Sequence, residues 1–225
     1  MLKLLLVLCL LAPAWARPSA HELCKQGDTL LSQGKAKESR QKFEEAIRLD
    51  PRCAEAFAGR GIQLSMEANE LLRKGDQKGG NQLHLQAIQD FSNAIRLAPK
   101  EPISWANRGN SYFRLNKFPQ ALSDLSQSLS LKSSDMSFAA RARCYTKMGQ
   151  EAKAIADYTQ AYKLSKNANF LFNRADCYLK MHQPDKAKAD YERVIRESKD
   201  ASVVDWAKAN LKPLQTPASS PSKSR

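Results

Sequence analysis

Apolar and small residues recur along most of this chain at the three- and four-residue steps of an α-helix. In one segment Ala87, Phe91, Ala94 and Leu97 follow each other in steps of four, three and three residues, which places them on one face of a helix. Pro99 stands just beyond this segment, where its missing N–H ends the helix. The pattern contains no strand-like alternation and predicts an all-α protein.

The helical segments repeat with a period of 33 or 34 residues, and two separate series of positions show it. The first is a large residue in the second helix of each repeat: Phe43, Phe91, Leu125, Tyr158 and Tyr191. The second is a small residue in the first helix: Gly27, Gly61, Gly109, Ala142 and Ala175. Both series share the period and a single 48-residue step, so we predict five helix pairs over residues 17–199.

The 48-residue step reflects 14 additional residues in the second repeat, within residues 65–86. Shared between its two helices, they add about two turns to each. The chain would reverse at residues 74–76, with Gly79 and Gly80 ending the turn and Asn81 capping the next helix. Four leucines would hold this long hairpin together: Leu71, Leu72, Leu83 and Leu85. A mobile 14-residue loop is the alternative.

The third repeat resembles the tetratricopeptide repeat (TPR) family. The matching residues are Trp105, Gly109, Tyr112, Ala121 and the segment 125–129, and Pro99 matches the proline that closes the preceding repeat. The resemblance extends over residues 20–199, although Lys166 and Lys199 stand where later repeats would have that proline. It implies a right-handed superhelical α-solenoid of about five helix pairs, whose first helices line a concave groove for a protein ligand.

The N-terminal residues have the order of a secretory signal peptide. Lys3 precedes an apolar run over residues 4–11, and Ala14-Trp15-Ala16 offers a cleavage site after residue 16. An uncleaved anchor is the alternative, but the apolar segment is shorter than the about 20 residues that span a membrane. No Asn-x-Ser/Thr sequon occurs, which favours a bacterial periplasm over secretion from a eukaryotic cell.

The C-terminal residues predict a cap and a tail. Residues 200–212 form a further helix that covers the exposed face of the last repeat. Pro213 would end it, and the Ser-, Pro- and Lys-rich residues 213–225 would be disordered. The apolar stripe of the cap consists of Val203, Trp206, Ala207 and Leu211.

An arginine and an aspartate recur in register with the repeat. The arginines precede the small residue of the first helix and are Arg60, Arg108, Arg141 and Arg174. The aspartates lie in the second helix and are Asp90, Asp124, Asp157 and Asp190. The first repeat has Gln26 and Lys42 instead, so both members are lost together. This pairing favours structural ion pairs between the two helices of a repeat over ligand binding.

A second set of polar residues forms one stripe along successive first helices, at spacings of three and four residues. In the resembling family these positions contact the ligand. The predicted partner-binding residues are Asn107, Asn110, Arg114, Arg143, Lys147, Asn173, Asp176 and Lys180. Their cations would attract an acidic segment and their amides would hydrogen-bond an extended backbone. The alternative is an ordinary solvated face of a basic protein.

Four cysteines lie beyond the signal peptide. Cys24 and Cys53 lie at neighbouring ends of the first helix pair, which makes a disulfide one hypothesis and four buried thiols the other. Cys144 and Cys177 are equivalents on adjacent helices, whose separation of about 8–10 Å exceeds the reach of a disulfide, so we expect them to remain thiols.

Catalysis finds little support in the sequence. The three histidines lie in different repeats, no pair has the helix spacing of a metal site, and no phosphate-binding glycine loop follows a strand. We expect no enzyme activity, cofactor, metal or nucleic-acid ligand.

The sequence therefore predicts an exported scaffold that binds an extended or acidic segment of a protein partner in a basic groove. The formal charge of +13 supports the alternative of an envelope-associated protein that binds anionic polymers or lipid headgroups. The two differ in salt dependence, because a diffuse charge contact is screened at high salt.

Overall fold

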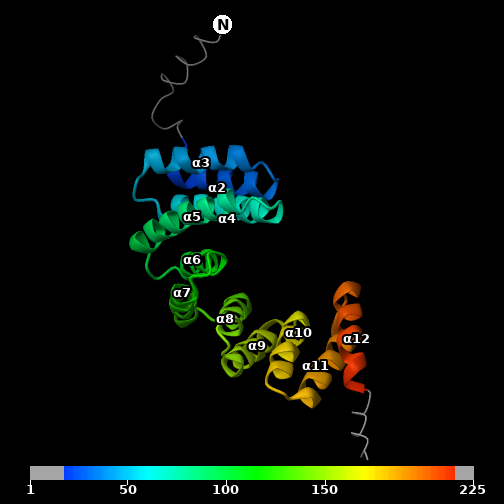
Figure 1. The fold of residues 1–225 in the computed structure, drawn as a ribbon. Helices are drawn as coiled ribbons and strands as arrows, with labels where there is room; N and C mark the ends of the chain where they lie inside the picture. The colour runs from blue at the N-terminus through cyan, green and yellow to red at the C-terminus, as the bar shows by residue number, and fades with distance from the viewer. Residues whose placement is uncertain (1–17, 216–225) are drawn as a thin grey trace, which may run out of the picture. The chain divides into compact units, whose positions relative to one another are not determined.

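The computed structural model describes residues 18–215, and every regular element within that range is an α-helix (Figure 1). The all-α class predicted from the sequence is confirmed. The chain divides into two compact units, one up to Asn116 and one from Lys117 onward. This boundary falls between the two helices of the third predicted repeat. No helix among the described residues is long and apolar enough to span a membrane.

The described part of the first unit, from residue 18, contains five helices, each of which packs on the next one in the sequence. Helix α2 also contacts α4, because the first helices of neighbouring repeats lie side by side. A capping box formed by Ser19 and Glu22 starts the unit: each side chain accepts a hydrogen bond from the backbone N–H of the other residue. The helices are α2 (Ala20–Ser32), α3 (Ala36–Leu49), α4 (Ala54–Arg73), α5 (Gln77–Leu97) and α6 (Pro102–Arg114).

Six helices make up the second unit as far as residue 215, again with each packed on its successor. Most of its buried apolar residues form one cluster that extends from Ala139 to Leu211. Aromatic residues of the second helices, such as Tyr158 and Tyr191, lie at its centre, as their recurrence in the sequence leads one to expect. The helices are α7 (Phe118–Leu131), α8 (Asp135–Lys147), α9 (Glu151–Ser165), α10 (Asn169–Lys180), α11 (Pro184–Glu197) and α12 (Ala201–Gln215).

The turn inside each helix pair uses the left-handed backbone conformation at one fixed place, the second residue after the first helix. This conformation reverses the chain within a few residues and suits glycine. Two of the five positions nevertheless carry a side chain. The residues, with their φ values, are Gly34 (76°), Gly75 (90°), Asn116 (58°), Gly149 (69°) and His182 (55°).

Glycines inside the first helices let a phenylalanine of the second helix approach closely. The fully buried ring of Phe43 lies where a Cβ on Gly27 or Gly59 would stand, at 2.8 and 2.2 Å. Phe91 occupies the same place against Gly61, at 2.8 Å. The small-residue series of the sequence thus marks positions where the large-residue series needs space.

The additional residues of the second repeat lengthen its two helices, to 20 residues in α4 and 21 in α5. Helix α5 begins at Gln77, and the carboxylate of Asp76 accepts a hydrogen bond from the backbone N–H of Gly79. The expectations that Gly79 and Gly80 end the turn and that Asn81 caps this helix were wrong, because Asp76 supplies the cap five residues before Asn81. Gly80 then lies in the first turn of α5, against Leu72 of α4. Of the predicted leucine set, Leu85 is exposed.

Helix α12 packs on α11 and buries Ala207 and Leu211. It extends to Gln215 with Pro213 inside it, so the expected end at residue 212 was wrong. Pro213 removes one backbone hydrogen bond from the last turn but does not end the helix. Trp206 is 60% exposed, which the apolar stripe did not predict. The predicted signal peptide and residues 216–225 of the predicted tail lie outside the described residues.

Candidate partner-binding surface

Arginine–aspartate pairs join the two helices of a repeat in both units. Each guanidinium donates two hydrogen bonds to one carboxylate, and each aspartate is almost fully buried. Arg108 lies in the first unit and Asp124 in the second, and their pairing stays a prediction. The other pairs, with their two N–O distances, are Arg60–Asp90 (2.8 and 2.7 Å), Arg141–Asp157 (2.7 and 2.8 Å) and Arg174–Asp190 (2.8 and 2.6 Å).

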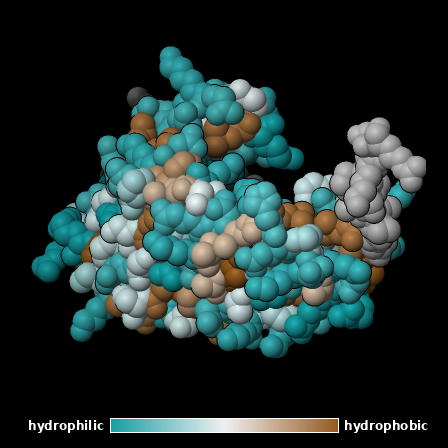
Figure 2. Space-filling model, turned by 60° about the horizontal axis from the view of Figure 1, so that its bottom comes forward, coloured by the Kyte–Doolittle hydropathy of each residue, from teal (hydrophilic) through white to brown (hydrophobic). Residues whose placement is uncertain are grey.

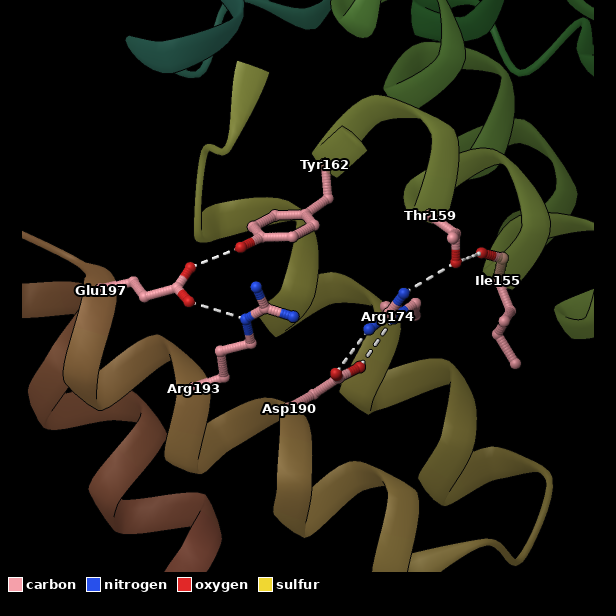
Figure 3. A network of polar contacts seen from close by, with 7 residues as sticks. All are labelled: Ile155, Thr159, Tyr162, Arg174, Asp190, Arg193 and Glu197. Atoms are coloured by element: carbon pink, nitrogen blue, oxygen red, sulfur yellow. Dashed lines mark hydrogen bonds and ion pairs between the residues drawn. The ribbon is translucent and has the colours of Figure 1, made fainter. Parts of the chain in front are cut away.

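Three arginines of the series, Arg108, Arg141 and Arg174, also reach back to the second helix of the preceding repeat. Nη1 of Arg174 donates to the hydroxyl of Thr159 on α9 at 2.8 Å (Figure 3). Arg141 makes this bond to Ser126 at 3.2 Å, and Arg108 makes it to Ser92 at 3.0 Å. Sequence reasoning missed this link, although a Ser or Thr stands two residues after three of the aspartates.

The paired carboxylates stabilise the protonated, charged form of these arginines. The pKa of Arg174 is raised, chiefly by its hydrogen bond to Asp190. The pKa of Arg60 is raised by the hydrogen bond and charge of Asp90 and, more weakly, by Glu44. Each of these pairs joins the two helices of its repeat, and their assignment as structural rather than ligand-binding residues stays a prediction.

A smaller polar network joins the C-terminal ends of α9 and α11. The hydroxyl of Tyr162 donates to Glu197 at 2.6 Å, and Nε of Arg193 donates to the other carboxylate oxygen at 2.7 Å (Figure 3). The guanidinium of Arg193 also lies 4.7 Å from the centre of the Tyr162 ring. These contacts fix the helices that support α10 and α12.

The predicted partner-binding residues of the second unit lie on α8 and α10. A contact of 3.5 Å between Thr146 Oγ1 and Cys177 Sγ shows that these helices touch near their C-terminal ends. Lys147 and Lys180 are the exposed last residues of the two helices. A cation at a helix C-terminus also stabilises the helix through its dipole, which accounts for part of the recurrence. Arg143 is exposed one turn before Lys147.

The side chain of Asp176 forms a hydrogen bond inside its repeat. Its Oδ1 accepts a hydrogen bond of 2.6 Å from the hydroxyl of Tyr191, and burial raises the pKa of its carboxyl group. The predicted contact of Asp176 with a partner therefore competes with its hydrogen bond to Tyr191. Asn173, one turn earlier, donates to the backbone oxygen of Asn169 at 3.0 Å and stays partly exposed.

Asn107, Asn110 and Arg114 lie on α6 of the first unit. The two asparagines are partly exposed and Arg114 is the exposed last residue of the helix. The pKa of the buried His84 is lowered by its burial and, secondarily, by the charge of Arg114. Whether these residues share a surface with α8 and α10 stays a prediction, because they belong to different units.

A pocket of about 400 Å³ opens between α10 and α12 in the second unit. The ring of Trp206 forms its exposed wall and packs on Phe172, with ring centres 4.8 Å apart. Asn169 and Asn173 add amide groups to its rim, and Ser202 and Val203 complete it. The face shown in Figure 2 is mostly hydrophilic and broken by separate hydrophobic patches. An apolar pocket with amide groups at its rim suits a peptide side chain.

The four cysteines of the described residues comprise one close pair and two separate buried thiols. Cys24 and Cys53 approach within 3.8 Å between their sulfurs, and their disulfide stays a prediction. Cys144 and Cys177 are buried thiols, and burial raises the pKa of Cys144 to about 11. A buried neutral thiol is a poor nucleophile, so these two residues behave as core residues.

Three tetratricopeptide repeat profiles match this chain, at residues 24–62, 137–167 and 168–201. No curated protein matches it. Many solved structures share the fold. TTC0263, a TPR protein of Thermus thermophilus, aligns with a TM-score of 0.62 and 20% identity over 86% of this chain and 100% of its own.

Two further structures have similar values. YrrB, described as a TPR protein with an unusual peptide-binding site, has a TM-score of 0.64 and 17% identity over 85% of this chain and 92% of its own. MamA from Desulfovibrio magneticus RS-1 has a TM-score of 0.66 and 16% identity over 81% and 97%. At such identities the likeness establishes the fold alone. The profiles and the fold agree that this chain carries tetratricopeptide repeats on the α-solenoid architecture of TPR proteins.

Proposed function

We propose that this protein is a non-enzymatic scaffold that binds an extended, acidic segment of a partner protein. The observation that carries the proposal is the pocket between α10 and α12, with Trp206 as its exposed wall. A tryptophan that is 60% exposed and backed by a second ring is a typical anchor for a peptide side chain. The tetratricopeptide repeats support a protein or peptide as the ligand.

In this proposal the partner lies along α10, with one apolar side chain in the pocket. The amides of Asn169 and Asn173 at the rim hydrogen-bond its backbone. Its acidic residues extend towards Lys180 and, on α8, towards Arg143 and Lys147. The charges set the direction and speed of binding, and the buried side chain supplies most of the affinity.

We further propose that the protein acts outside the cytoplasm, in a bacterial periplasm or as a secreted protein. The order of Lys3, the apolar run over residues 4–11 and Ala14-Trp15-Ala16 supports export. N-terminal sequencing of the protein from an envelope or secreted fraction should find Arg17 as the first residue. An intact Met1 on protein from the cytoplasm would contradict export.

The binding proposal is tested with a partner captured from that fraction and then purified. Arg143→Glu with Lys147→Glu should weaken binding at least tenfold, because two cations facing acids become repulsive. Trp206→Ala should weaken it by a similar factor through loss of the pocket wall. The matched control is Lys163→Glu with Arg196→Glu, which makes the same change in net charge at exposed positions of α9 and α11.

The outcomes separate the two functions considered for this protein. A scaffold with a defined site loses affinity with the first two variants, keeps it with the control, and retains part of it at high salt. An equal loss for both charge reversals, unchanged binding of Trp206→Ala and loss of binding at high salt would instead show general attraction to anionic polymers or headgroups.

A further inference from the structure

Four side chains that can bind a metal ion meet where the first turns of α2 and α4 lie side by side. His21 and Cys24 come from α2, Cys53 is the residue just before α4, and Glu55 lies in the first turn of α4. The sulfurs of Cys24 and Cys53 are 3.8 Å apart. These two sulfurs and a carboxylate oxygen of Glu55 all lie within 4.8 Å of one another.

We propose that Cys24, Cys53 and Glu55 bind a zinc ion. Two thiolates that are each about 2.3 Å from zinc in a tetrahedral site are separated by about 3.8 Å, which is the distance between these sulfurs. The backbone is therefore already placed for both Zn–S bonds. A disulfide uses the same two residues, but it needs the sulfurs to approach to about 2.0 Å.

The donor atoms select the class of metal. Two soft thiolates and one carboxylate are typical of zinc, whereas calcium and magnesium require a shell of oxygen atoms. Zinc carries no redox chemistry of its own, so the ion would act as a cross-link in this scaffold.

The surroundings of the cluster provide both a rigid side and an open side. Cys24 is buried against the core of the first repeat, which includes Leu23 and Phe43. The side chains of His21 and Glu55 are 59% and 62% exposed, so an ion can enter from solvent and keep a water as its fourth ligand.

His21 orients the carboxylate ligand. Its Nδ1 lies 2.7 Å from Oε2 of Glu55, which fixes that carboxylate beside the two sulfurs. Hydrogen bonds of this kind to metal ligands commonly raise affinity about 10–100-fold. We therefore assign His21 as a positioning residue and the other three as ligands.

The zinc ion would cross-link two helices that are not consecutive in the sequence. Helix α3 separates α2 from α4 in the sequence, and the metal would join the starts of both. This inference is independent of the proposed partner-binding site, which lies in the other unit.

The test uses the full chain, purified in the presence of a reductant, with Zn²⁺ and then Co²⁺ as probes. We expect one equivalent of zinc that resists gel filtration, and thiolate-to-cobalt charge-transfer absorption with the intense visible bands of tetrahedral Co²⁺. Cys53→Ser and Cys24→Ser should abolish both signals, and Glu55→Gln should weaken binding at least tenfold. His21→Ala should weaken it about 10–100-fold while leaving the charge-transfer bands in place.

Cys144→Ala and Cys177→Ala are the matched controls, because they remove buried thiols elsewhere and should leave the cobalt spectrum unchanged. Circular dichroism establishes that each variant is folded. Because Cys53 is only partly buried and Glu55 is partly exposed, their variants remain informative if Cys24→Ser does not fold. Absence of the charge-transfer bands, zinc binding that survives Cys53→Ser, or a Cys24–Cys53 disulfide in protein purified without added oxidant would overturn the proposal.

Discussion

Arg141 on α8 donates two hydrogen bonds of 2.7 and 2.8 Å to Asp157 on α9, and its remaining nitrogen donates one to the hydroxyl of Ser126 on α7. A single guanidinium thus joins three consecutive helices. Arg174 repeats the arrangement one step later with Asp190 and Thr159.

Arg141→Glu should lower the free energy of unfolding by about 3–5 kcal/mol, because it sets a second carboxylate beside the buried Asp157. Arg143→Glu, two residues along the same helix at an exposed position, should change it by no more than about 0.5 kcal/mol. Urea unfolding followed by circular dichroism measures both. Equal stabilities of the two variants would show that the pair does not hold the repeat together.

Gly59→Ala should destabilise the first unit. Its Cβ would lie 2.2 Å from the ring of Phe43, which is fully buried and cannot move away freely. Overpacking costs about 1–3 kcal/mol and outweighs the gain of up to about 1 kcal/mol in helix propensity. Phe43→Leu with Gly59→Ala should be more stable than the sum of the single changes predicts. Thermal unfolding of the four proteins gives this coupling, and additive effects would contradict the contact.

The stability of the protein should fall as the pH is lowered from about 6.5 to about 4. Burial lowers the pKa of His84 to about 4, helped by the charge of Arg114, and neither ring nitrogen has a hydrogen-bond partner among the described residues. Between these pH values the unfolded chain binds a proton that the folded protein excludes, so acid favours unfolding.

The magnitude of this effect is about 1–3 kcal/mol at pH 4 relative to pH 7. Its measurement is the free energy of unfolding at both pH values for the natural protein and for His84→Leu. The difference between the two proteins removes the contribution of titrating acids elsewhere. An identical pH dependence for both would exclude His84 as its source.

His182→Gly should stabilise the second unit by about 0.5–1 kcal/mol. His182 has a φ of 55°, a backbone conformation that costs energy for a residue with a Cβ and none for glycine. Asn116→Gly is the comparison, and it should gain less because asparagine tolerates this conformation better. The melting temperatures of both variants measure these gains in stability. A loss of stability in His182→Gly would contradict the prediction.

The repeat and its ion pairs could be predicted from the sequence because each depends on spacing along a helix. The period alone is enough to place Phe43 against Gly27 and Arg174 beside Asp190, and both contacts are present. Boundaries were less accurate, because local chemistry decides them: the carboxylate of Asp76 caps α5 ahead of Asn81.

Features made by separate helices could not be predicted from spacing. The cluster of His21, Cys24, Cys53 and Glu55 depends on how α2 rests on α4. The sequence placed Cys24 near Cys53, but it did not show that His21 and Glu55 join them. The exposed Trp206 and its pocket likewise depend on how α12 meets α10.

The arginine series ends before α12. One period beyond Arg174 stands Ala207, a fully buried residue without charge. Helix α12 can therefore detach without breaking a guanidinium pair, and its amides should exchange hydrogen faster than those of α8 to α11. Since α12 carries Trp206, a wall of the pocket belongs to a helix that no arginine–aspartate pair joins to its neighbour. A ligand held in this pocket should therefore slow amide exchange throughout α12, including at residues that it never touches.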